Sequence, residues 1–188
     1  MMWLEILLIV LAVAVLVLIA MWVVSARRLD ALHRGVIQSR VAACDALAVR
    51  SATAERLANA NILDAAGSVL LAEAAHHARS LSHTPIVEDG LEGPPRALGD
   101  VPDRREVESN LSRTLRAVLA GLDVADLTDE ERELLEQLET SRSAVRISRR
   151  MHNSRVDQVR RLRSRFLVGV LRMAGTAALP QPVDLDDD

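Results

Sequence analysis

The chain begins with an apolar segment long enough to cross a membrane. From Ile6 to Val24 it reads ILLIVLAVAVLVLIAMWVV, 19 residues without a charge. At 1.5 Å of rise per residue, a helix of this length approximately spans a hydrocarbon core of about 30 Å. The residues before it, MMWLE, contain Glu5 and no base, unlike the cationic start of a secretory signal peptide. We therefore predict an uncleaved transmembrane anchor over residues 1–25.

Basic residues flank this apolar segment on one side only. Four arginines follow it at close range and none precedes it; they are Arg27, Arg28, Arg34 and Arg40. Basic residues next to a membrane span are retained on the cytoplasmic side. This asymmetry predicts a single-pass protein of the cell membrane, with its N-terminus outside and a domain of residues 26–174 in the cytoplasm.

After the anchor, apolar residues recur at steps of three, four and seven. This spacing predicts an amphipathic helix from Arg27 to about Asn61, continuous with the membrane span. The apolar positions are Leu29, Leu32, Val36, Ala43, Leu47, Ala54 and Leu57. A second helix is predicted over residues 61–81, and residues 61–67 contain either a turn or an unbroken connection between the two.

Residues 82–103 interrupt the helical pattern. They hold four of the six prolines and are predicted to form a mobile loop. Asp103 is followed three residues later by Glu106, a capping-box spacing that predicts the start of a third helix. Gly121 suits a left-handed residue at the end of that helix.

A second capping box, Thr128 with Glu131, predicts the start of the last helix. No proline follows until Pro180, so a helix of 40 or more residues is expected. The end of the chain is acidic and contains two prolines, and residues 175–188 are therefore predicted to be a disordered tail. Because aromatic residues make up only 2% of the chain, the core must be built from Leu, Val, Ile and Ala. The predicted fold is an all-α, elongated antiparallel helical bundle with long, coiled-coil-like helices.

Charge is segregated along the second half of the sequence. Residues 86–141 carry fifteen acids and six arginines, whereas residues 142–172 carry ten arginines and one acid. These opposite blocks predict pairing between neighbouring helices, or at least mutual screening of their charges. On a helical projection most arginines of the last helix lie opposite its apolar stripe, but Arg155 and Arg163 lie in or beside it. A buried guanidinium needs a carboxylate, so both are predicted to form buried ion pairs; the candidate partners are Asp45, Glu106 and Glu108.

The remaining arginines of the last helix are candidates for outside contacts. Arg149, Arg150, Arg160 and Arg161 are predicted to contact phosphate or a partner. Tethering to a bilayer favours an anionic lipid surface as the source of that phosphate. Nucleic acid is disfavoured, because Phe166 is the sole aromatic residue beyond the anchor and the isoelectric point is near 6.0.

Catalytic patterns are not recognisable in the sequence. Glu73, His76 and His77 have the spacing of ligands in di-iron bundles, but such a site needs a second E-x-x-H pair, which the sequence does not contain. A single cysteine, Cys44, excludes an internal disulfide and a multi-thiolate metal site. We expect a protein that is not an enzyme, without catalytic, metal or cofactor-binding residues.

Two stretches resemble the LemA family of single-pass membrane proteins. In the first long helix, the matching residues are Arg34, Val36, Leu47 and Arg50. In the last helix, they are Arg149, Arg150, Asn153, Val156 and Phe166. The chain departs from the family pattern with His152 for a tyrosine, Arg160 for an asparagine, Leu167 for a proline and Arg40 near a tryptophan.

The resemblance implies an elongated helical bundle tethered to a membrane, and it carries over no catalytic residues. The expected function is that of a membrane-anchored scaffold or interaction protein. Its expected partners are the lipid bilayer and an unidentified protein partner or a second copy of the chain. The alternative is a module that binds anionic lipid or nucleic-acid phosphate through the arginine-rich last helix.

Overall fold

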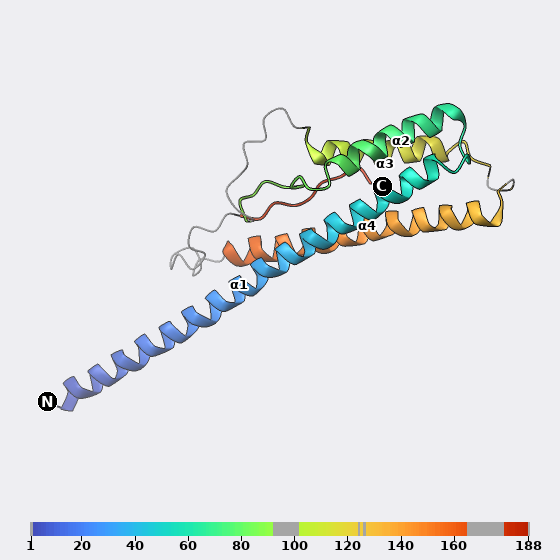
Figure 1. Cartoon of the computed structure of the whole chain (residues 1–188). Coiled ribbons are helices and arrows are strands. Elements are labelled where there is room, and N and C mark those ends of the chain that lie inside the picture. Colours follow the sequence, from blue (N-terminus) through green and yellow to red (C-terminus); the bar gives the residue numbers. More distant parts are fainter. Residues whose placement is uncertain (1, 92–101, 124, 126, 165–178, 188) are drawn as a thin grey trace.

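The computed structural model describes residues 2–91, 102–123, 125, 127–164 and 179–187. Within these ranges there are four helices and no strand, which confirms the all-α prediction (Figure 1). The helices are α1 (Met2–Ala58), α2 (Ala65–Ser80), α3 (Arg104–Leu119) and α4 (Asp129–Arg163). The predicted continuation of the last helix past Ser164 falls on residues 165–178, outside the described part of the chain.

Helix α1 is one unbroken helix of 57 residues with two different halves. Its first half extends away from the other helices (Figure 1), and none of the residues in its apolar segment is buried. By length and composition this segment could cross a membrane, as the sequence predicts. Its second half carries the periodic apolar residues and enters the bundle.

Helix α4 runs antiparallel along the second half of α1, α2 packs on α1, and α3 packs on α2 (Figure 1). Buried side chains form three clusters along the bundle, and the middle cluster includes Leu47 and Val145. At the end far from the apolar segment all four helices meet, with Leu57, Leu71, Leu115 and Leu138 almost fully buried. At the opposite end α1 and α4 pack on each other, and Leu91 from the segment after α2 packs against them. The buried residues there are Leu29, Val36, Val156 and Val159.

The helix boundaries test the capping predictions. Thr128 and Glu131 form the predicted capping box, and Asp64 caps α2 after a turn that settles the connection between the first two helices. Asp103 caps α3, as predicted. Its carboxylate accepts from the backbone N–H of Arg105, so the cap is not the predicted capping box with Glu106. The prediction of a left-handed residue at Gly121 is wrong, because α3 ends at Leu119, its cap Ala120 has ordinary helical angles, and Gly121 has no positive φ.

Two segments predicted to be mobile or disordered belong to the core. Residues 82–91 are not helical, as predicted, but Ile86 and Val87 are buried against Leu47. Residues 179–187 form an extended strap in which Val183 and Leu185 are buried in the same cluster. The structure therefore differs from the expectation of a mobile loop at 82–91 and of a disordered tail at 179–187, since both segments contribute buried side chains. Alternating apolar residues, which point to one side of an extended chain, explain how an acidic tail can dock.

Candidate functional site

The bundle holds a buried ionic cluster between α1 and α3. The Arg50 guanidinium lies 2.9 Å from the Glu108 carboxylate and donates at 2.7 Å to the Ser112 hydroxyl. Arg104, one turn before Glu108, approaches the other carboxylate oxygen at 3.5 Å. The three charged side chains are at most 2% exposed. Burial raises the pKa of Glu108, against the attraction of the two guanidinium groups, and burial lowers the pKa of Arg50.

Arg104 also fastens the segment after α2. Its guanidinium donates to the backbone carbonyl groups of Ser82 at 3.0 Å and Thr84 at 2.7 Å. A carbonyl inside a protein needs such a donor, since a buried unpaired backbone group costs free energy. The cluster around Glu108 therefore links α1, α3 and the segment 82–91.

A second buried ion pair joins α1 to the same segment. Arg40 binds both carboxylate oxygens of Asp89, and Asp89 also accepts from the backbone N–H groups of Gln181 at 3.0 Å and Leu91 at 3.2 Å. Burial raises the pKa of Asp89, but the bonds from Arg40 and from these N–H groups outweigh it and hold the pKa below its usual value. Asp89 thus connects α1, the segment 82–91 and the strap.

The strap is held mainly by side chains of α4. Arg149 lies 2.6 Å from Asp187, which is 3% exposed. The Asn153 amide donates to the Val183 carbonyl at 2.9 Å and accepts from the Val183 N–H at 2.8 Å, as a neighbouring β-strand would. Arg160 donates to the Pro180 carbonyl at 3.0 Å. Two positions of the LemA-like pattern, Arg149 and Asn153, therefore bind the chain's own C-terminal segment.

The two arginines predicted to form buried ion pairs are half-buried on α4. Arg155 is half-buried and donates at 2.8 Å to the Gly35 carbonyl, with no carboxylate partner in the described chain. Arg163 is also half-buried, near His33. A helical projection gives the direction of a side chain but not its reach, and long arginines bend their charge away from an apolar stripe.

The three acids that were candidate partners of those arginines do not form ion pairs with them in the described chain. Glu108 binds Arg50 and Arg104 instead. Within the described ranges, Asp45 and Glu106 make no ion pair. Within the described ranges, Arg155 therefore binds a backbone carbonyl and not a carboxylate. The sequence patterns did not single out Arg40, Arg50 and Arg104 as buried, although their places on apolar faces were the available signal.

The four arginines predicted to face outward divide into two groups. Arg149 differs from the prediction, because it forms an ion pair with the buried Asp187 and is not available to an outside phosphate. Arg150, Arg160 and Arg161 are exposed. Arg150 makes no ion pair in the part of the chain that the structure describes, and Arg161 lies 4.0 Å from Asp157.

The acidic block does pair with the basic block at Glu139, its last acid, but this pairing lies along one helix and not between neighbouring helices. Arg142 and Arg146 both pair with Glu139 on their own helix, α4. Glu108, in the acidic block, pairs across to α1 instead. Glu139 and the strap's Asp187 therefore pair with part of the basic face of α4.

His152 lies fully buried between α1, α4 and the strap. Its Nδ1 is 3.2 Å from the Ser39 hydroxyl and its Nε2 is 3.4 Å from the Gln181 carbonyl. Burial lowers the pKa of His152, with the Gln181 contact opposing, and burial followed by the Arg163 charge lowers the pKa of His33. Both imidazoles are therefore held in the neutral form, and the core contains two groups that resist protonation.

Acidification is expected to destabilise the bundle through these two histidines. An unfolded histidine binds a proton below a pH of about 6.5, whereas the folded ones bind it at lower pH. The stability that these two neutral histidines contribute is therefore fully present above a pH of about 6.5. It is lost progressively as the pH falls from that value to the lower pKa of the folded histidines. Thermal unfolding of the full chain in neutral detergent, compared at about pH 7.5 and 5.5, should show a lower midpoint in acid. His152→Gln should reduce the difference, and His76→Gln, at an exposed position, should leave it unchanged.

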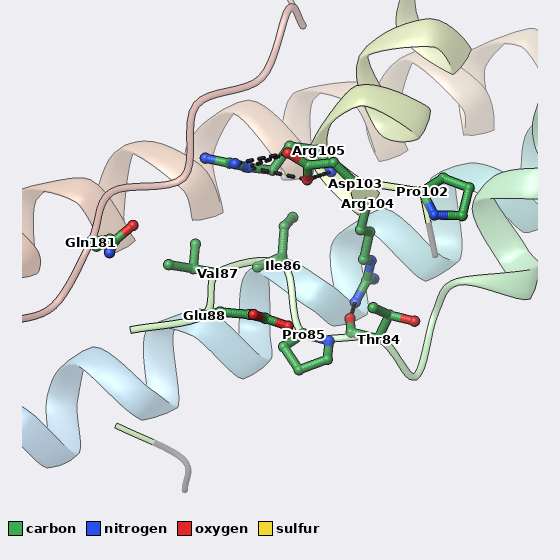
Figure 2. Close-up of a pocket in the computed structure, with 10 residues that line it drawn as sticks. All are labelled: Thr84, Pro85, Ile86, Val87, Glu88, Pro102, Asp103, Arg104, Arg105 and Gln181. Carbon is green, nitrogen blue, oxygen red and sulfur yellow. Dashed lines mark hydrogen bonds and ion pairs between the residues drawn. The ribbon is translucent and has the colours of Figure 1, made fainter. Parts of the chain in front are cut away.

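A cavity of about 390 Å³ opens where the segment 84–88 faces the start of α3 (Figure 2). Asp103 and Arg105 pair with each other at 2.7 Å on its rim, and Arg104 points to the Thr84 carbonyl. These polar groups satisfy one another, and no nucleophile lies beside a general base among the lining residues. Among the described residues that line it, the cavity therefore shows no arrangement of catalytic groups.

The remaining sequence candidates stay apart. Glu73, His76 and His77 are exposed on α2, and no group of three side chains able to hold a metal occurs in the described ranges. Cys44 is half-buried, forms no disulfide within the described residues, and accepts a hydrogen bond from Arg104 at 3.7 Å. Comparisons with protein-family models, curated proteins and solved structures found no match to this chain.

Proposed function

We propose that the protein is a membrane-anchored helical scaffold or interaction protein, without catalytic activity and related in design to the LemA family. The observation that carries this proposal is α1, which is at once an exposed apolar segment and the central helix of the bundle. A partner bound to the bundle would be held at the membrane by the same rigid helix. The positive charges after the apolar segment favour the cytoplasmic side for the bundle.

An exposed face between α1 and α4 suits a protein partner or a second copy of the chain. Val49, Ala144 and Ile147 line two adjoining grooves there, and the side chains of Val49 and Ile147 are exposed. Apolar residues on a ridge between two helices provide the contact area that a third helix would bury. This face supports the scaffold proposal over the alternative of a phosphate-binding module spread along all of α4.

Alkaline carbonate extraction tests the anchor. The native chain should stay in the membrane pellet, while Val13→Arg should shift part of it to the supernatant, because an arginine at the centre of a span costs about 3 kcal/mol of insertion. Val41→Arg is the matched control. It adds the same charge to the same helix, at a solvent-exposed position in the half of α1 that belongs to the bundle. Quantitative release of the native chain would disprove the anchor.

A further inference from the structure

A cleft lies between α1 and α4 at the end of the bundle nearest the apolar segment. It has a volume of about 320 Å³, and the C-terminal end of α4 lies beside the part of α1 that leads into that segment (Figure 1). The lining residues are Arg28, Leu32, Ser154, Gln158, Arg161 and Leu162. The cleft thus combines two cations, two neutral hydrogen-bonding groups and two leucines.

The position of this cleft along α1 places it at the depth of lipid headgroups. Arg28 follows Val24, the last residue of the apolar run, by four positions, which is about 6 Å along a helix. The headgroup layer on each side of a bilayer is about 5 to 8 Å thick. If the run spans the bilayer, Arg28 therefore lies among the phosphates. The packing of Leu29 and Val159 in one buried cluster brings the end of α4 to nearly the same depth.

The surroundings of the cleft are strongly basic. Residues 27–34 and 155–163 together contain seven arginines and two aspartates. Arg28 is exposed and makes no ion pair in the described chain. Arg161 is exposed as well, and its contact with Asp157 at 4.0 Å is at the outer limit of an ion pair. Neither guanidinium has a strong partner to give up on binding an anion.

We propose that this cleft binds the phosphate headgroup of an anionic phospholipid. Arg28 and Arg161 bind the phosphate oxygens, as guanidinium groups do in fixed geometry. Ser154 and Gln158 hydrogen-bond the polar part of the headgroup, and Leu32 and Leu162 pack against the glycerol carbons. The proposal rests on the proposed membrane anchoring, and it assigns the lipid to one site at the α1–α4 junction.

The test uses the full chain in neutral detergent, titrated with short-chain phosphatidylglycerol and with short-chain phosphatidylcholine. Phosphatidylglycerol should bind more tightly than phosphatidylcholine. The double variant Arg28→Gln with Arg161→Gln should weaken phosphatidylglycerol binding about thirtyfold, since each arginine near an anionic lipid contributes about fivefold. The control Arg56→Gln with Arg150→Gln removes two exposed arginines farther along the bundle, and should change the affinity by less than about twofold.

Other outcomes overturn the proposal in distinct ways. An equal loss in the control would mean diffuse attraction by net charge. Displacement of the lipid by inorganic phosphate at equal concentration would mean a site for free phosphate. If the native chain resists carbonate extraction but shows no preference for phosphatidylglycerol, the headgroup site is wrong while the anchor stands. If the native chain is released by carbonate, the proposed function itself fails.

Discussion

Glu108→Gln should lower the free energy of unfolding by about 4 kcal/mol, because removal of one partner leaves buried charge uncompensated. Glu108 is the carboxylate that both Arg50 and Arg104 approach, and all three side chains are inaccessible to water. Glutamine keeps the shape of the side chain and removes its charge. The two guanidinium groups would then face each other across a neutral amide, with only the more distant Asp187 as a counter-charge for Arg50.

Denaturant unfolding of the full chain in neutral detergent, followed by helical circular dichroism at neutral pH, measures this loss. Glu106→Gln is the matched control, since Glu106 is an exposed acid two residues away on α3. Its effect should stay within about 0.5 kcal/mol. Equal stabilities for the two variants would show that the cluster is not held as an unsolvated ionic group.

The strap offers the second large effect. Val183→Asp should destabilise the bundle by about 4 kcal/mol, from the lost apolar burial and from a carboxylate placed where Val183 is fully buried. The strap should then detach, and Asp89, Arg149 and Asn153 would lose the bonds that they make to it.

Hydrogen exchange of the Gln181 and Val183 amides reports the detachment directly, because both N–H groups are bonded in the native chain. In Val183→Asp they should exchange at the rate of an unfolded peptide. Asp184→Asn changes an exposed neighbour and should leave both amides protected. Rapid exchange of these amides in the native chain would contradict a docked strap.

Much of the secondary structure could be predicted because its signals are local. The apolar run, the helical spacing from Leu29 to Leu57 and the capping box at Thr128 each act within a few turns of one helix. The strap was missed although its alternating Val183 and Leu185 resemble a strand, because the surrounding aspartates and prolines indicated disorder. Composition describes a segment's average polarity, whereas docking depends on which few side chains point inward.

By itself, the sequence determined that the chain is helical, that one apolar segment could cross a membrane, and where most helices begin. Only the tertiary structure decided which arginines of the described ranges are buried. Arg40 meets a carboxylate 49 residues away and Arg50 meets one 58 residues away. Helical periodicity acts between neighbours in the chain. An ion pair forms where separate elements bring opposite charges together, and a helical projection of α4 alone cannot show that its end lies beside the turns of α1 that follow the apolar segment.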